Sequence, residues 1–169
     1  MIATEAGLGE YLADLVQEIE RFAVTLLPPN DDPEEIALGR DSDGAFLVDL
    51  ECRPPIPRRS ADVVIELFER WEQIGAGRYE RTDYKFELRD HELQFRRAFH
   101  RHDSAQFLRA LDVATHEHCE ATLGVALCDH YFGEPVPDAR SGFLRLYDLW
   151  LTNQQPDCSK LRCLDAASA

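Results

Sequence analysis

Histidines are the residues in this chain whose types and spacing could support chemistry. Five of the six histidines lie in one stretch: His100, His102, His116, His118 and His130. The first four form two His-x-His pairs, and the fifth follows Cys128 after one intervening residue. No other stretch concentrates titratable or metal-ligating groups so tightly. The sequence therefore places its candidate site here, although no motif in the stretch fixes a reaction.

Metal binding is the first chemistry that this pattern suggests. Zinc is bound by three or four nitrogen or sulfur ligands arranged as a tetrahedron. Four candidate ligands follow one another in the second half of the stretch: His116, His118, Cys128 and His130. The spacing is not a standard zinc signature, because it contains no Cys-x-x-Cys pair. The sequence thus leaves open either no cofactor or zinc bound by these four residues.

Metal-free acid–base catalysis is the second chemistry. Histidine titrates near neutral pH, so a pair can act as base and acid when a phosphodiester of RNA is cleaved through the neighbouring 2′-hydroxyl. Arginine beside such a pair can hold the phosphate or stabilise developing negative charge. The candidate catalytic residues are four histidines and two arginines: His100, His102, His116, His118, Arg96 and Arg101.

An ordinary polar sheet face would explain the same residues without any function. A histidine on the exposed face of a strand can hydrogen-bond a carboxylate such as Asp103, Glu117 or Glu120. Cys119 and Cys128 can equally be small, buried apolar residues. All three interpretations stay open at this point.

The elements that must position the histidines have the pattern of an antiparallel hairpin followed by one more strand. Apolar and polar residues alternate over 83–88 and again over 93–100, on both sides of a polar turn, as in strands with one buried face. In this register the first His-x-His pair lies on the face opposite the core. Residues 112–120 are a further strand candidate, on which the second pair shares one face.

The chain as a whole predicts a single α+β domain. Amphipathic helices are expected at 8–26 and 138–151, because apolar side chains recur there at three- and four-residue steps. Residues 62–74 fit a helix or a strand, and a strand is favoured because the next segment pairs with it naturally. An antiparallel β-meander packed by the two long helices would occupy residues 1–152. The polar tail, 153–169, is expected to be disordered.

One part of the chain, residues 78–120, resembles a known protein family. The resemblance is carried by Tyr-Lys-Phe-Glu-Leu-Arg-Asp (84–90), Leu-Gln-Phe-Arg (93–96), His-Arg-His-Asp (100–103) and His-Glu-His (116–118). Their order looks like the compact sheet-plus-histidine layout of TumE-type toxins from bacterial toxin–antitoxin pairs. The chain departs from that family where it reads Arg-Arg-Ala-Phe-His-Arg-His in place of an Asp-Asn-Ala-Pro-His-His-like segment. The resemblance implies a nuclease-like toxin relative that acts on RNA.

Charge and cysteine content narrow the setting of the protein. The net charge is −14, and the acidic residues concentrate in the N-terminal third, which argues against broad, non-specific nucleic-acid binding. The five cysteines are odd in number and widely spaced, and no signal peptide is apparent, so no disulfide framework is predicted. No apolar run approaches the roughly 18 residues of a membrane span. We therefore expect a soluble protein in a reducing, cytoplasmic setting.

Two function classes follow from these observations. The first is a nuclease-like toxin relative that uses histidine acid–base chemistry on RNA. The second is a non-enzymatic protein-interaction or regulatory module with a protein partner, either dimeric or stabilised by zinc. A homodimer would use the apolar stripe of the helix at 8–26, although the same stripe is equally expected to pack on the rest of the domain.

Overall fold

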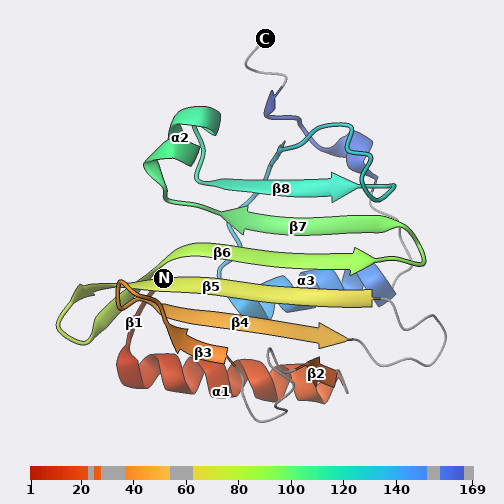
Figure 1. The fold of residues 1–169 in the computed structure, drawn as a ribbon. Helices are drawn as coiled ribbons and strands as arrows, with labels where there is room; N and C mark the ends of the chain where they lie inside the picture. Colours follow the sequence, from red (N-terminus) through yellow and green to blue (C-terminus); the bar gives the residue numbers. More distant parts are fainter. Residues whose placement is uncertain (23–24, 28–36, 54–62, 152–156, 166–169) are drawn as a thin grey trace.

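The computed structural model describes residues 1–22, 25–27, 37–53, 63–151 and 157–165. Within these ranges the chain forms one open sheet with three α-helices (Figure 1). Every strand pairing in the described part of the sheet is antiparallel. The fold class is therefore α+β with an antiparallel sheet, as the sequence predicts.

The main path of the sheet runs β2-β4-β5-β6-β7-β8-β9, while β3 pairs with β4 and β1 pairs with β6. From β4 onward the spatial order follows the order in the chain, so each strand lies next to the one before it. The strands span β1 (Ile2–Thr4), β2 (Thr25–Leu27), β3 (Ala37–Arg40), β4 (Phe46–Arg53), β5 (Val63–Gly75), β6 (Arg78–Asp90), β7 (Phe95–Arg101), β8 (Thr115–Glu120) and β9 (Tyr131–Phe132).

The centre of the sheet is the long hairpin of β5 and β6. Buried and half-buried residues alternate along most of β5, and Val63, Ile65 and Leu67 are buried. Gly77 adopts a positive φ of 63° in the turn, a conformation that glycine tolerates best, and the chain then reverses so that the two strands pair along most of their length. The prediction of a strand over 62–74 is therefore confirmed for its described residues.

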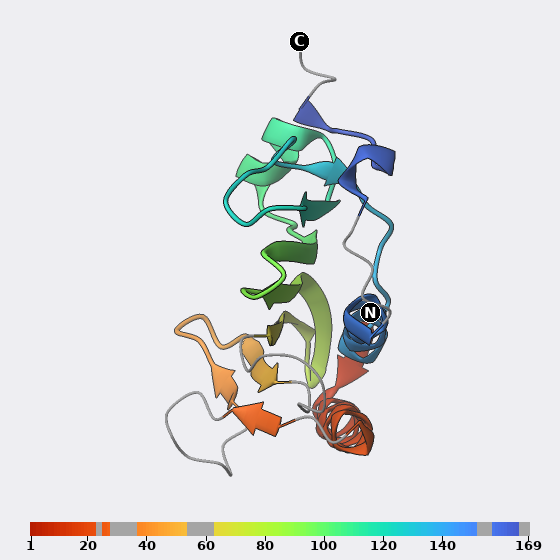
Figure 2. The same ribbon diagram turned by 90° about the vertical axis from the view of Figure 1, so that its right-hand side faces the viewer.

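Helices α1 (Glu5–Arg21) and α3 (Ala139–Leu151) lie on the same side of the sheet (Figure 2). At the start of α1 the Thr4 hydroxyl accepts a hydrogen bond from the Gly7 N–H at 3.1 Å, which caps the helix. Both helices contribute buried side chains to the main hydrophobic core: Leu8, Leu12, Leu15 and Ile19 from α1, and Phe143 and Leu146 from α3. The apolar stripe of α1 is thus covered within its own chain, and a homodimer through it stays a prediction.

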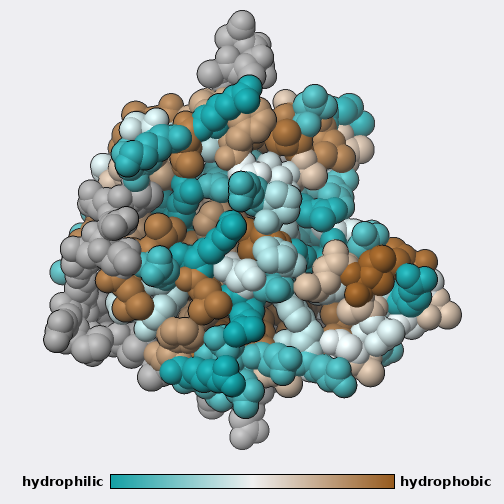
Figure 3. All heavy atoms as spheres, turned by 180° about the vertical axis from the view of Figure 1, so that it is seen from behind, coloured by the Kyte–Doolittle hydropathy of each residue, from teal (hydrophilic) through white to brown (hydrophobic). Residues whose placement is uncertain are grey.

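The outer surface on the helix side is mixed in character. Seen from behind, hydrophilic and hydrophobic residues are interspersed over the described part of this side (Figure 3). This is the expected appearance of amphipathic helices whose apolar stripes face inward. No helix in the described part of the chain is both long and apolar enough to cross a membrane.

The first helix is shorter than the predicted range of 8–26. It ends at Arg21 with Phe22 as its C-cap, and β2 follows at 25–27. Leu26 fits the helical spacing, but here it lies in a strand opposite Cys52 of β4, so pairing at the edge of the sheet has outweighed local periodicity. The helix predicted at 138–151 agrees closely with α3.

The prediction that the cysteines form no disulfides is wrong. Cys119 is bonded to Cys158, and Cys128 is bonded to Cys163, while Cys52 is buried as a free thiol. The bonded partners are 39 and 35 residues apart in sequence, so their spacing alone did not reveal the pairing. Disulfides persist mainly in oxidising compartments. They therefore argue against the reducing setting that we expected.

The two disulfides attach part of the tail for which disorder was predicted, 153–169, to the sheet. The structure describes residues 157–165 of this tail, which include the 3₁₀ helix η1 (Cys158–Lys160). Two backbone hydrogen bonds join this segment to the region of β9: the Phe132 N–H donates to Arg162 O at 2.9 Å, and the Leu164 N–H donates to His130 O at 2.8 Å. We call residues 157–165 the C-terminal segment.

Candidate functional site: a histidine cluster

Strands β7 and β8 pair so that the two His-x-His motifs lie side by side. His100 lies directly opposite His116, and Ala98 lies opposite His118. Phe99, between the two positions on β7, belongs to the main core with the helices. Because successive side chains of a strand point to opposite faces, both motifs occupy the face away from α1 and α3. This is the face that the sequence pattern predicts for them.

Five imidazoles gather at this place, from β7, β8 and the segment before β9. Three of the rings, which we call central, have centroid distances of 4.5 Å between His100 and His118, 4.8 Å between His116 and His118, and 5.1 Å between His100 and His116. His102 lies 5.6 Å from His100. His130 lies 5.0 Å from His116 and 5.2 Å from His118. We call these five residues the histidine cluster.

The ring nitrogens of the three central histidines converge. One nitrogen each of His100, His116 and His118 lies within 4.8 Å of the other two. The Nε2 atoms of His116 and His118 are 3.0 Å apart, and two nitrogens bound to one tetrahedral zinc ion would be about 3.3 Å apart. His100 Nε2 is buried and makes no hydrogen bond with the described residues. His116 and His118 are therefore spaced much like two ligands of one zinc ion, and His100 lies close enough to be a third.

A buried carboxylate from β6 adjoins the cluster. Glu87 has no exposed surface, and its Oε2 lies 3.9 Å from His100 Nε2. Burial alone would raise the pKa of Glu87, but the neighbouring His100 ring and the Arg96 guanidinium hold this pKa well below its usual range. Glu87 is therefore ionised beside the cluster, where Lys85, Arg89 and Arg96 also pair with it.

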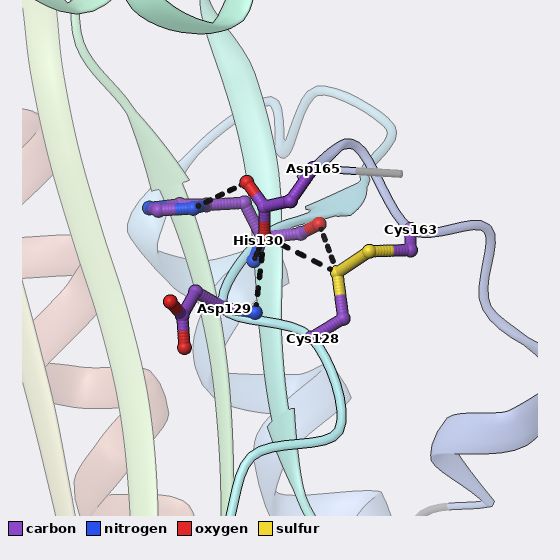
Figure 4. Close-up of a disulfide and its surroundings, with 5 residues drawn as sticks. All are labelled: Cys128, Asp129, His130, Cys163 and Asp165. Atoms are coloured by element: carbon purple, nitrogen blue, oxygen red, sulfur yellow. Dashed lines mark hydrogen bonds and ion pairs between the residues drawn. A yellow bond between two sulfur atoms is a disulfide. The ribbon is translucent and has the colours of Figure 1, made fainter. Parts of the chain in front are cut away.

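The two outer histidines each face a carboxylate. His102 Nδ1 lies 3.4 Å from Asp83 Oδ1, and His130 Nδ1 lies 3.3 Å from Asp165 Oδ1. Figure 4 shows the His130 ring extending away from Asp165, with its second nitrogen at the far end. A histidine that binds a metal usually donates its other N–H to a carboxylate or carbonyl, which fixes the tautomer and the ring orientation. Both outer rings have this kind of support.

The two arginines predicted to hold a phosphate are engaged by carboxylates. Arg96 donates to Glu87 at 2.7 and 3.0 Å and to Glu120 at 2.9 Å. Arg101 donates to Asp103 at 3.1 and 2.8 Å. Phosphate binding by either arginine would therefore require breaking these ion pairs.

Burial lowers the pKa values of the three central histidines. It lowers the pKa of His116 to about 2 and that of His118 to about 3, and the neighbouring His100 ring acts in the same direction on both. The pKa of His100 is also lowered by burial. A general acid must be protonated near the working pH, so these three imidazoles are poorly suited to that role. The neutral imidazole is the form that ligates metals.

A hollow of about 250 Å³ adjoins the cluster. Its lining includes His118 and His130 of the cluster together with Arg96, Glu120 and Asp129. His118 and His130 thus border a space large enough for water or a small ligand.

The structure brings together the four histidines predicted as catalytic residues and places His130 beside them. Cys128, one of the four predicted metal ligands, does not join them as a thiolate, because its sulfur is bonded to Cys163. His100 takes its place in the set of converging nitrogens. Of the predicted ligands His116, His118, Cys128 and His130, the disulfide therefore removes Cys128 as a thiolate, and metal binding by the others stays a prediction.

Three carboxylates beside the cluster were missed by sequence reasoning. Asp83 and Glu87 alternate with apolar residues along β6, so the same register that placed the first histidine pair could have revealed them. Asp165 carried no such signal, because it lies 35 residues beyond His130 in a segment without a periodic pattern. Its position depends on the fold of the C-terminal segment.

Comparison with protein-family models, with curated proteins and with solved structures finds no match to this chain. The resemblance of residues 78–120 to TumE-type toxins therefore stays a prediction. The geometry of the histidine cluster is the observation from which a function is inferred.

Proposed function

We propose that this chain binds one divalent transition-metal ion, zinc in the first place, in the histidine cluster. The observation that carries this proposal is the convergence of ring nitrogens from His100, His116 and His118 within 4.8 Å of one another. The buried His100 Nε2 has no hydrogen-bond partner among the described residues, a state that costs about 1–3 kcal/mol. A bound cation would satisfy this nitrogen.

Zinc suits this donor set best among the common ions. It takes nitrogen ligands in a tetrahedral arrangement, and sites with three protein ligands keep the fourth position for water or another ligand. The disulfide at Cys128 leaves imidazole nitrogens as the donors, a set that copper and nickel also accept. Titration with each of these ions will rank them.

The direct experiment is a zinc titration of chelator-stripped protein in competition with a chromophoric chelator. We expect one equivalent per chain and a loss of affinity of at least about 100-fold in His116→Gln, because a ligand has been removed. His91→Gln is the matched control, since His91 is exposed in the turn between β6 and β7, outside the cluster. Equal affinity of wild type and His116→Gln would overturn the proposal.

RNA cleavage is a second candidate function, favoured by the hollow that gives a ligand access to His118 and His130. A zinc-bound water has a pKa of about 7 and would supply the nucleophile or base that metal-free histidine chemistry needs. An RNA oligomer should be incubated with zinc-loaded and with stripped protein. Cleavage by the zinc-loaded form alone supports metal-assisted hydrolysis, while cleavage by the stripped form that His100→Ala abolishes supports the acid–base scheme. Intact RNA in both samples removes this function.

If RNA stays intact, metal binding would instead serve a regulatory or interaction module. An ion that binds the folded chain and not the unfolded chain stabilises the fold by mass action. We then expect zinc to raise the thermal unfolding midpoint of wild type and of His91→Gln, and to leave that of His116→Gln unchanged.

A further inference from the structure

We propose that Asp165 positions His130 as a further ligand of the metal site, and that the two disulfides hold Asp165 in place, so that their reduction weakens metal binding. This inference rests on the proposed function, because it concerns the regulation of the same site. In this proposal the C-terminal segment supports metal binding by the histidine cluster through Asp165.

Asp165 contacts both the backbone and the ring of His130. Its Oδ2 accepts hydrogen bonds from the backbone N–H groups of Asp129 and His130, both at 3.1 Å. Its Oδ1 lies 3.3 Å from His130 Nδ1 (Figure 4). One carboxylate therefore fixes both the backbone and the ring of the same histidine.

The contact between Asp165 and His130 Nδ1 selects one tautomer of the His130 ring. A carboxylate at Nδ1 favours a proton on that nitrogen and leaves the lone pair on Nε2. Nε2 is the end of the ring away from Asp165, and the ring lies 5.0 Å from His116 and 5.2 Å from His118 between centroids. The nitrogen farther from the carboxylate thus carries the lone pair.

Two disulfides attach the segment that carries Asp165 to the rest of the chain. Cys163, two positions before Asp165, is bonded to Cys128, two positions before His130. Cys158 is bonded to Cys119, the neighbour of His118 on β8. Each disulfide therefore joins the C-terminal segment to a position next to the cluster.

Reduction would release these attachments. A dithiol reductant transfers two electrons and two protons to a disulfide: the Cys128–Cys163 bond breaks, two thiols form, and the reductant becomes a disulfide. A second dithiol reduces the Cys119–Cys158 bond in the same way, and the C-terminal segment then keeps only its hydrogen bonds and non-covalent packing. Asp165 would leave His130 more often, and the ring would lose its fixed orientation.

The test for Asp165 is a double-mutant cycle on zinc affinity with Asp165→Asn, His130→Ala and the combined variant. Asparagine can still accept from the two backbone N–H groups, but its NH₂ group then faces Nδ1 and shifts the ring proton to Nε2. We expect Asp165→Asn to weaken zinc binding about 10–100-fold in the wild-type background and to have no effect when His130 is alanine. Equal effects in both backgrounds, or no effect in either, would overturn the positioning role.

The test for the disulfides uses Cys128→Ser combined with Cys163→Ser, which removes one attachment without creating new thiolate ligands. We expect this variant to lose zinc affinity to about the same extent as Asp165→Asn, and to lose nothing when His130 is alanine. A variant that binds as tightly as wild type would overturn the redox part. If Asp165→Asn fails to fold, as circular dichroism would show, the serine variant and its His130→Ala counterpart decide the whole inference.

Failure of this inference can be told apart from failure of the proposed function. If wild type binds zinc and His116→Gln does not, while Asp165→Asn and the serine variant bind normally, the metal site stands and the positioning role falls. If wild type binds no zinc, both fall together.

Discussion

The two faces of the sheet each bury a group of polar residues, and the two groups differ in the chemistry of their members. On the helix side, Glu69 accepts hydrogen bonds from Tyr11 at 2.9 Å, from Arg81 at 2.6 Å and from Trp71 at 3.0 Å. Arg81 also donates to the carbonyls of Val136 and Pro137. The buried carboxylate thus has a donor at each oxygen, and the buried charge of Arg81 has an opposite charge beside it.

On the other face, the histidine cluster consists of groups of the same kind. The Nε2 atoms of His116 and His118 form a hydrogen bond of 3.0 Å whose direction depends on the tautomers, and His100 Nε2 has no hydrogen-bond partner among the described residues. The helix-side groups are of unlike kinds that hydrogen-bond and ion-pair with one another, so a structural role accounts for them. The convergence of like ligand atoms in the histidine cluster is the observation from which we propose metal binding.

The largest expected effect tests the helix-side network. Glu69→Gln should lower the free energy of unfolding by about 3–5 kcal/mol, because it leaves the buried Arg81 charge without its partner. Glu5→Gln is the matched control: Glu5 pairs with Arg40 on the surface, and its loss should cost about 0–1 kcal/mol. Urea unfolding measures both. Similar, small losses for the two variants would contradict a structural role of the network.

The next effect concerns the disulfides at the histidine end of the sheet. Replacing either one by a pair of serines should lower the free energy of unfolding by about 2–4 kcal/mol. Hydrogen exchange on the reduced protein should show faster exchange in β8, β9 and the C-terminal segment, while β5 and β6 keep their protection. Uniform loss of protection across the sheet would mean that the disulfides support the whole domain.

A pair of glycines gives effects of opposite sign on the helix side. A Cβ at Gly142 of α3 would lie 2.4 Å from the Phe86 ring, so Gly142→Ala should cost about 1–3 kcal/mol. A Cβ at Gly9 of α1 would meet nothing within 4 Å, so Gly9→Ala should stabilise the protein by about 0.5–1 kcal/mol. Thermal unfolding of both variants checks the close packing of α3 on β6, and stabilisation by both would refute it.

The smallest effect distinguishes a binding site from a structural cluster. His100→Leu replaces a buried imidazole by an apolar side chain, and it should stabilise the metal-free protein by up to about 1 kcal/mol while abolishing tight zinc binding. If the cluster were a structural network like that of Glu69, the same change would destabilise the protein. The sign of the change in the metal-free state is therefore the decisive observation.

Local periodicity predicted the parts of this fold that depend on neighbouring residues. Alternation along β6 and β7 gave the hairpin and the shared face of His100 with its partners, and the apolar steps over 138–151 gave α3. The end of α1 was misjudged because Leu26 satisfies helical spacing as well as it satisfies a strand. Pairing with β4 decides between the two, and that contact is remote in sequence.

The parts that sequence could not provide depend on contacts between distant segments. Cys119 meets Cys158 across 39 residues, and Cys128 meets Cys163 across 35. Asp165 contacts His130 across 35 residues. No spacing rule reports such contacts, and the zinc ligands predicted from sequence therefore included Cys128, whose sulfur is bonded to Cys163.

X-ray absorption spectroscopy at the zinc edge of the zinc-loaded protein tests the central claim most directly. We predict three or more nitrogen ligands at about 2.0–2.1 Å with the signature of imidazole and no sulfur ligand. A shell that contains sulfur at about 2.3 Å, or only oxygen ligands, would contradict a metal site made by the histidine cluster.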